Sequence, residues 1–210
     1  KMEKKLLPFI LLSCCSIGTI SGCGVKGKQT DDNISNSATI VSDNTVSSGF
    51  DLDLAAEQIS IKGNSLKIPV QLSNLPENWR YEIKESPFTN GFGLARLFYN
   101  DEEVITAGIM NFYEGKEGKS VIYNIYIDDD SSSIANIIPQ KDTRDDVLRK
   151  LGEPTSEHEE DISETIHSHI LVYGDKGTIS GINGSDAQCV TVSLNTDNIV
   201  NSVSISYVSK

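Results

Sequence analysis

The segment TRDDVLRKLGEP, from Thr143 to Pro154, constrains the fold more strongly than any other stretch of the sequence. Thr143 is placed to cap a helix, because its hydroxyl can accept a hydrogen bond from the backbone N–H of Asp146. Gly152 can adopt the left-handed conformation after the last turn, and Pro154 prevents the helix from continuing. Three apolar side chains share one narrow stripe of this helix: Val147, Leu148 and Leu151. A helix this short is marginal alone, so we expect its stripe to pack on a sheet.

Alternating apolar residues separated by turn sequences predict antiparallel strands on both sides of this helix. Before the helix we expect a hairpin at 59–68 with its turn at Gly63–Asn64, a short helix at 70–75, and strands at 79–83, 94–99, 104–113 and 121–127. After the helix we expect an acidic run at 157–161, followed by strands at 165–173, 178–182, 188–194 and 199–207, with an Asn183–Gly184 turn.

The predicted fold class is α+β, with antiparallel sheet and one or two short helices packed on one face. The folded part divides into an N-terminal β-rich unit at 50–136 and a C-terminal helix-plus-meander unit at 137–210. The periodicity fits one continuous sheet and fits two tandem helix-plus-sheet units equally well.

The first residues have the pattern of a bacterial export signal. Two lysines precede an apolar run from Leu6 to Ile20, which is shorter than the ~20 residues of a membrane-spanning helix. The run ends in Ile20-Ser21-Gly22-Cys23, which resembles the lipobox of bacterial lipoproteins. This resemblance implies a signal peptide at 1–22 and a lipidated Cys23 that anchors the protein in the lipid bilayer, on the extracytoplasmic face of the cell membrane. An uncleaved anchor is the alternative. The polar stretch at 23–49 predicts a disordered tether.

The capped helix with its Leu151-Gly152-Glu153-Pro154 stop, followed by a strand that ends in Tyr173-Gly174, resembles a known domain. It is similar to the domain of small outer-membrane-assembly lipoproteins and β-lactamase inhibitor proteins, over about 137–207. The resemblance implies helices on one face of an antiparallel sheet, and a role in binding other proteins. This chain departs from the family in having one short helix where two are usual, and in its extra N-terminal strands. The lipobox, tether and domain together also resemble uncharacterised surface lipoproteins of Gram-positive gut bacteria.

Charge and cysteine content exclude some functions. The formal net charge is −12, from 18 Lys and Arg against 30 Asp and Glu. A surface of this sign repels phosphate, so we do not expect a nucleic-acid partner. Cys189 is the one cysteine beyond the leader and lipobox. Its apolar neighbours predict an inert, buried thiol. Because the other cysteines lie in the leader and lipobox, we expect no disulfide within the folded part.

Two polar clusters suggest metal binding. His167 and His169 point to the same face of a strand, so both imidazoles can reach one metal ion. The alternative places both histidines on the solvent face, with Ile166, Ile170 and Val172 in the core. The Asp128–Asp130 run with Ser131–Ser133 lacks the spacing of a calcium loop, and we interpret it as solvated.

The sequence contains no phosphate-binding loop, nucleophile elbow or zinc-protease motif. We therefore expect no cofactor and no enzymatic activity, and a hydrolase is the least favoured hypothesis. Aromatic residues concentrate in the first half of the folded part, where we expect most of them, including Trp79, to be core. Phe88 and Phe92 lie in a Pro/Gly/Asn loop and are the candidate partner-binding residues. The leading hypothesis is an extracytoplasmic protein-binding module; the alternative is a metal- or small-solute-binding lipoprotein that uses His167 and His169.

Overall fold

The computed structural model describes residues 49–84, 91–163, 166–175 and 188–208, all within one compact unit that spans 46–210. The helices are α1 (Leu52–Glu57), η1 (Leu72–Asn74), η2 (Glu117–Lys119) and α2 (Arg144–Leu151), of which η1 and η2 are 3-10 turns. The strands of the first half are β1 (Ile59–Ile61), β2 (Asn64–Leu66), β3 (Val70–Gln71), β4 (Trp79–Ile83), β5 (Gly93–Tyr99), β6 (Glu102–Met110), β7 (Val121–Ile127) and β8 (Ser133–Ile134). The strands of the second half are β9 (Ser156–Ser163), β10 (Ile166–Asp175), β11 (Gln188–Leu194) and β12 (Val200–Ser206).

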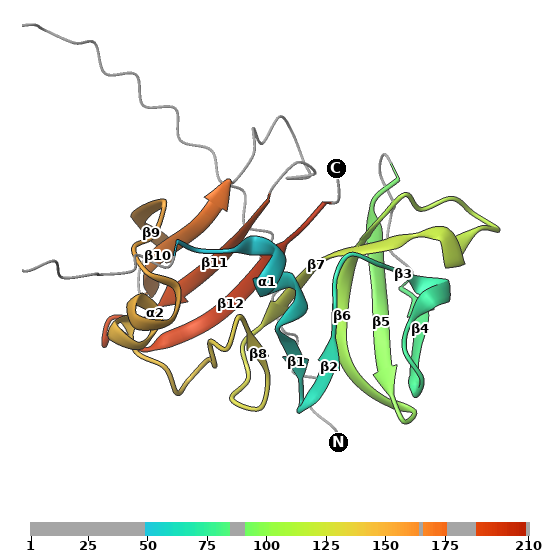
Figure 1. Ribbon diagram of the computed structural model, residues 1–210, viewed down its shortest axis with the longest axis horizontal. Coiled ribbons are helices and arrows are strands. Elements are labelled where there is room, and N and C mark those ends of the chain that lie inside the picture. The colour runs from blue at the N-terminus through green and yellow to red at the C-terminus, as the bar shows by residue number, and fades with distance from the viewer. Residues whose placement is uncertain (1–48, 85–90, 164–165, 176–187, 209–210) are drawn as a thin grey trace, which may run out of the picture. The chain divides into compact units, whose positions relative to one another are not determined.

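One antiparallel sheet contains most of the strands (Figure 1). Eight of its nine strands run in the order β4-β5-β6-β7-β12-β11-β10-β9, and the ninth, β3, pairs with β7. A second sheet has the order β2-β1-β8. Strand β7 pairs with β6 on one side and with β12 on the other, so strands from 50–136 and 137–210 belong to the same sheet. The structure is therefore mostly antiparallel sheet with two short α-helices.

The helix expected after Thr143 is confirmed as α2. The Thr143 hydroxyl accepts from the N–H of Asp146, and the Asp146 carboxylate accepts from the N–H of Thr143, which completes a capping box. Gly152 ends the helix with a positive φ of 79°. Val147 and Leu151 are buried, so the predicted apolar stripe is the face that packs.

Helix α1 was not expected from the sequence. Its N-cap Asp51 accepts from the N–H of Leu54, and it buries two small residues, Ala55 and Ala56. The helix expected at 70–75 is wrong: this stretch forms β3 and the turn η1. Strand pairing prevents the helix, because the backbone of Val70 pairs with Ile122 of β7 and is not available for helical hydrogen bonds.

The hairpin expected at 59–68 is confirmed as β1 and β2, with its turn one residue earlier than expected. Lys62 and Gly63 both have positive φ, as the tight turns of hairpins require. The acidic run at 157–161 belongs to a strand, β9, that the sequence did not predict. Its charged residues lack the apolar alternation that predicts a strand. They are tolerated because β9 lies at the edge of the sheet. The strand expected at 178–182 and the Asn183–Gly184 turn lie outside the described residues.

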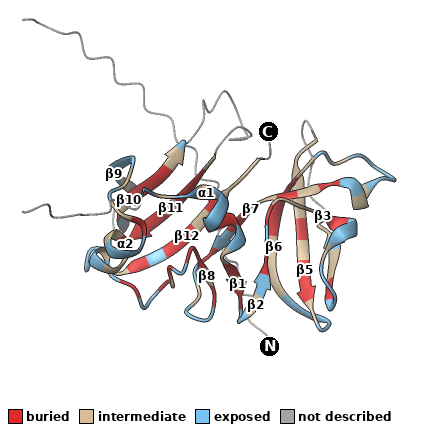
Figure 2. Cartoon of the chain, viewed as in Figure 1, coloured by how far each residue is buried: buried red, intermediate tan, exposed pale blue. Residues whose placement is uncertain are grey.

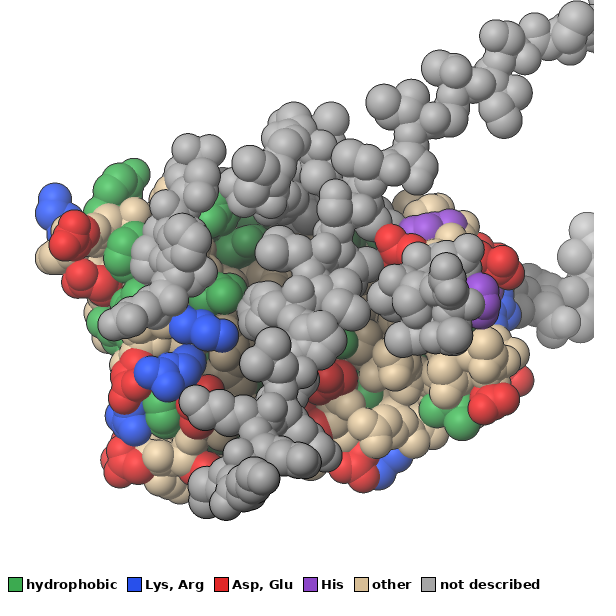
Figure 3. Space-filling model, turned by 180° about the vertical axis from the view of Figure 1, so that it is seen from behind, with side chains coloured by type: hydrophobic (Ala, Val, Ile, Leu, Met, Phe, Trp, Pro, Cys, Tyr) green, Lys and Arg blue, Asp and Glu red, His purple; other side chains and the backbone are tan. Residues whose placement is uncertain are grey.

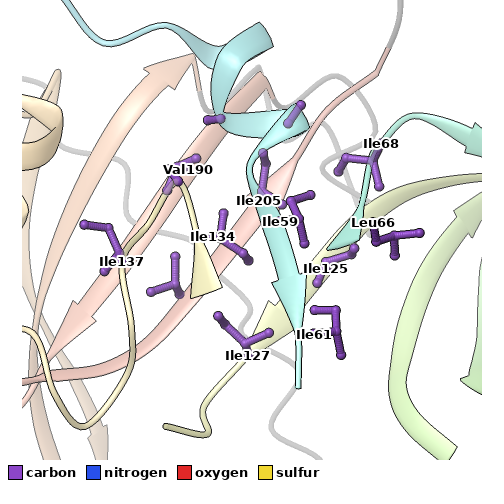
Figure 4. Packing of buried hydrophobic residues seen from close by; sticks show 14 of the residues in the cluster. Ile59, Ile61, Leu66, Ile68, Ile125, Ile127, Ile134, Ile137, Val190 and Ile205 are labelled. Carbon is purple, nitrogen blue, oxygen red and sulfur yellow. The ribbon is translucent and has the colours of Figure 1, made fainter. Parts of the chain in front are cut away.

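One hydrophobic core contains residues from both sheets and both α-helices. Figure 2 shows the buried positions along the strands in red. Figure 4 shows core residues contributed by the two sheets: Ile59, Ile61, Leu66, Ile125, Ile127, Ile134, Val190 and Ile205. Trp79 is buried in this core, as expected, and its ring lies edge-on to Tyr99. The large sheet thus has one face on the core, and we call its opposite face the outer face.

Candidate interaction surface

The outer face of the large sheet is defined by the register of β5, β6 and β7. Leu94 pairs with Gly108, and Gly108 pairs with Asn124, so these three residues lie side by side across the strands. Their neighbours Ala95 and Ala107 are fully buried in the core. Because successive residues of a strand point to opposite faces, Leu94, Gly108 and Asn124 face away from the core.

Four apolar and aromatic side chains lie on this face, and we call them the aromatic patch: Phe92, Leu94, Tyr123 and Tyr126. The rings of Phe92 and Tyr123 meet edge-to-face, with centroids 5.6 Å apart. Tyr126 lies two residues beyond Asn124 on β7 and is 47% exposed, although it is a large apolar side chain. The other three members are half-buried. The patch is thus partly ordered by its own contacts and partly open to solvent.

Gly108 shapes the middle of the patch. A Cβ at this position would lie 3.0 Å from Asn124 Cβ and 3.3 Å from Tyr123 Cε1, so the Tyr123 ring rests against the bare glycine backbone. The Asn124 amide donates to Ser206 Oγ at 3.0 Å and to the Ile205 carbonyl, which fixes it toward β12. Burial raises the pKa of the Tyr123 hydroxyl. Tyr123 is therefore held as a neutral, ordered ring.

A set of ion pairs lies on β4, β5, β6 and the turn between β5 and β6, and we call it the charged cluster: Arg80, Glu82, Arg96, Asp101 and Glu103. Arg80 contacts Glu82 and Asp101 at 2.9 Å each, and Arg96 contacts the other oxygen of Glu82 at 2.9 Å. The Arg80 guanidinium also lies 3.7 Å from the centroid of the Phe98 ring, which it covers. The hydrogen bond to Asp101 is the main cause that raises the pKa of Arg80. Hydrophobic and charged side chains adjoin on the face that Figure 3 shows.

The loops at one end of these strands are tied together. The Phe112 N–H donates to the Gly91 carbonyl at 2.8 Å, which joins the β6–β7 connection to the residues before β5. Tyr113, the next residue, is 64% exposed. The β6–β7 connection thus carries an exposed tyrosine.

The sequence-based candidates for partner binding are Phe88 and Phe92. Phe92 lies in the aromatic patch, whereas Phe88 lies outside the described residues. Tyr123 and Tyr126 were not singled out from the sequence. Their strand, VIYNIYI, alternates irregularly because the register shifts between Gly108 and Ile109, so the outward positions of β7 cannot be counted from its ends.

The histidine pair lies on β10. His167 and His169 face the same side of the sheet as Leu171 and Tyr173, which are buried in the main core. Ile170 and Val172 are buried, as the alternative expected, in a separate small cluster with Cys189 on the other side of the strand. His167 is exposed and His169 is half-buried. The predicted burial of Cys189 is confirmed.

His169 takes part in a charged bridge between strand and helix. Its Nε2 lies 3.4 Å from Glu157 Oε2, and the same oxygen lies 3.1 Å from Arg144 Nη2 at the start of α2. Among the described residues, no group of three or more His, Cys, Asp or Glu side chains is arranged to hold a metal ion. The carboxylate of Glu157 next to His169 is therefore already shared with an arginine.

The remaining polar candidate is the loop at 128–133. Asp129 Oδ1 accepts from the Ser131 N–H, from the Ser131 hydroxyl and from the Ser132 hydroxyl. These bonds lower the pKa of Asp129 against the opposing effect of its partial burial, which is the largest single influence. The carboxylate thus orders its own loop. Cys23, the predicted lipidation site, lies outside the described residues.

In the described part of the chain, no helix has the length and apolar character needed to cross a bilayer. The chain matches no protein-family model, no curated protein and no solved structure.

Proposed function

We propose that this protein is a non-catalytic binding module, anchored by lipid on Cys23 at the extracytoplasmic face of the cell membrane, whose partner is another protein. The observation that carries the proposal is Tyr126, which is 47% exposed on the outer face of the sheet, the face that also carries the Phe92–Tyr123 ring pair. Tyrosine and arginine are over-represented among the residues that dominate binding energy at protein interfaces. Both residue types adjoin here.

The order of this surface supports the same function. The Tyr123 ring rests on Gly108 and Phe92, and the two arginines of the charged cluster share Glu82. Binding loses less conformational entropy when side chains are already held in one geometry. The surface therefore resembles a pre-organised interface more than a mobile polar face.

The chemistry of the surface indicates the kind of partner. The arginines of the charged cluster are already paired with carboxylates, so they provide a polar rim without a strong net field. The aromatic patch supplies the apolar centre that such a rim surrounds. We expect a folded protein partner that presents an apolar or aromatic residue, and an affinity that depends only weakly on salt.

A photo-crosslinker placed on the patch tests this function. Benzoylphenylalanine is introduced at Tyr126 in the full chain in intact cells, and the adducts are identified by mass spectrometry. The proposal predicts one saturable protein adduct, weakened in a Phe92→Ala background because the ring that supports Tyr123 is lost.

The matched control is the same crosslinker at Leu54, which is 50% exposed on α1 and lies outside the patch. Adducts of equal yield at both positions would show non-specific contact and would refute the patch as the interface. Circular dichroism of the Phe92→Ala variant must show that the fold is retained.

The lipid anchor has its own test. Replacement Cys23→Ala removes the proposed lipidation site, so the full chain should move from the membrane fraction to the soluble fraction. Retention of the variant in the membrane fraction, with resistance to release by carbonate, would contradict lipid anchoring at this residue.

The placement of the two α-helices is a further part of the proposal, because helices on one face of a sheet are what the resemblance to binding domains implies. In the α+β arrangement that we propose, α1 and α2 cover the same face of the large sheet. Ala56 of α1 and Val147 of α2 both belong to the core cluster that contains Val190 and Val203 of the sheet. The opposite face is then left for the partner.

Metal or small-solute binding by His167 and His169 is the second function that we propose, and it has less support. The carboxylate of Glu157 near His169 is the observation in its favour. Zinc should then raise the melting temperature of the wild type and leave a His167→Ala, His169→Ala double variant unchanged. No shift in the wild type would refute it.

A further inference from the structure

A cavity of about 230 Å3 lies between α1 and the end of α2, apart from the aromatic patch. Three segments line it: 49–58, the turn at 135–136 that follows β8, and 150–151 at the end of α2. Its apolar wall contains Phe50, Ala55 and Leu151. This is room for a small molecule rather than for a large cofactor.

Hydrogen bonds between the three segments hold the cavity open in one shape. The Ala135 N–H donates to the Gln58 carbonyl at 2.8 Å, and the Asn136 amide donates to Gln58 Oε1 at 3.0 Å. Lys150 Nζ donates to the Asn136 carbonyl at 2.8 Å. The walls are thus fixed before any ligand arrives, which lowers the entropic cost of binding.

The charges at the cavity favour a cation. The positive charge of Lys150 is balanced by Asp142, whose Oδ2 lies 2.7 Å from Nζ. Asp51 contributes a carboxylate that accepts from the Leu54 N–H through Oδ1; its other oxygen has no hydrogen bond to another described residue. The C-terminal end of α2 adds partial negative charge.

Two further features act in the same direction. Phe50 supplies an aromatic ring, and ammonium groups are attracted to aromatic faces. The protein as a whole has a net charge of −12, which raises the local concentration of cations and lowers that of anions.

We infer that this cavity binds a small organic cation, an ammonium group carried on a compact apolar body. The ammonium group lies at Asp51, and the apolar body rests on Phe50, Ala55 and Leu151. The amide oxygen of Asn136 is a second acceptor for the N–H groups of a primary ammonium.

Three probes of similar size and different charge test this inference on the full chain: phenethylammonium, 2-phenylethanol and 3-phenylpropionate. Binding is measured by NMR titration, with the amide signals of 49–58 and 135–136 as the readout. Phenethylammonium should bind with a dissociation constant of about 1 mM or lower. The carboxylate should bind about tenfold more weakly, because Asp51 repels it.

The variant Asp51→Asn separates the charge from the shape. Asparagine is as good a helix N-cap as aspartate, so α1 is retained while the carboxylate is lost. Phenethylammonium should bind about three- to fivefold more weakly to this variant, whereas 2-phenylethanol should bind as before. The matched control is Asp53→Asn, which removes the same charge from α1 at a residue that does not line the cavity.

Equal affinity for the ammonium and the carboxylate, an equal loss in both variants, or no binding of any probe at about 10 mM would overturn the inference. These outcomes leave the proposed protein interface unaffected, because the aromatic patch shares no residue with the cavity lining.

Discussion

Tyr173 on β10 donates its hydroxyl hydrogen to the carbonyl oxygen of Gly152, the residue that ends α2, at 3.1 Å. The ring is fully buried, and Phe50 lies against it with centroids 5.5 Å apart. One side chain thus connects the C-terminal end of α2, the large sheet and the segment that precedes α1. The stability of this connection should depend on the protonation of Tyr173.

The variant Tyr173→Phe tests that dependence. Burial, followed by the nearby Glu153 carboxylate, raises the pKa of Tyr173 to about 12, against about 10 in an unfolded chain. The raised pKa means that the protonated hydroxyl stabilises the fold fully below pH ~10 and that this contribution is lost as the pH rises through ~12. The wild type should exceed the variant by about 1 kcal/mol near neutral pH, and the advantage should vanish between pH ~10 and ~12. Urea unfolding across this range measures it; a constant difference contradicts the assignment.

The Asp142 side chain joins the end of α2 to the loop before it. Its Oδ2 accepts from the Ile138 N–H and from Lys150 Nζ, both at 2.7 Å. In Asp142→Ala, the Ile138 N–H loses its acceptor and the part-buried Lys150 ammonium loses its carboxylate partner, so we expect a loss of about 2–4 kcal/mol in the free energy of unfolding. The control is Lys67→Ala, which breaks the exposed pair with Glu57 and should cost less than about 1 kcal/mol. Similar losses in the two variants would refute the role given to Asp142.

Gly174 lies in β10 with a φ of +99°, and a Cβ there would lie 2.3 Å from the Gln188 carbonyl oxygen. Gly63, in the β1–β2 turn, has a φ of +81° but nothing within 4 Å of a built Cβ. Both alanine variants should lose about 1 kcal/mol in the free energy of unfolding, because alanine disfavours a positive φ. Only Gly174→Ala adds a clash with the backbone. Thermal unfolding should therefore show a clearly larger loss for Gly174→Ala. Equal losses would mean that β10 and β11 separate without cost.

The α2 capping box predicts an effect of acid. Hydrogen bonds from the Thr143 N–H, the Thr143 hydroxyl and Arg149 lower the pKa of Asp146 to about 2. Since the folded pKa lies below the unfolded value of about 3.9, the stabilisation is present above pH ~4 and is lost as the pH falls toward ~2. The melting temperature of the wild type should therefore exceed that of Asp146→Asn above pH ~4 and converge with it near pH ~2. A difference that does not change over this range would contradict the prediction.

Local sequence was sufficient for the elements whose causes are local. Thr143, Asp146 and Gly152 specify where α2 begins and ends, because caps act through hydrogen bonds and φ values within a few residues. The positive φ of Gly63 belongs to a turn that its own residue type favours. Alternation likewise placed β4, β5 and β12 close to where they lie.

Tertiary structure decided the rest. Val70 forms a strand because β7 pairs with it, and the acidic 157–161 run forms a strand because β10 does, although neither segment has the composition of one. The aromatic patch depends on the register shift at Gly108, which brings Phe92 and Tyr123 into contact although they are far apart in sequence. Such contacts depend on the free energy of packing strands that are distant in sequence, and this free energy cannot be predicted from any short segment alone.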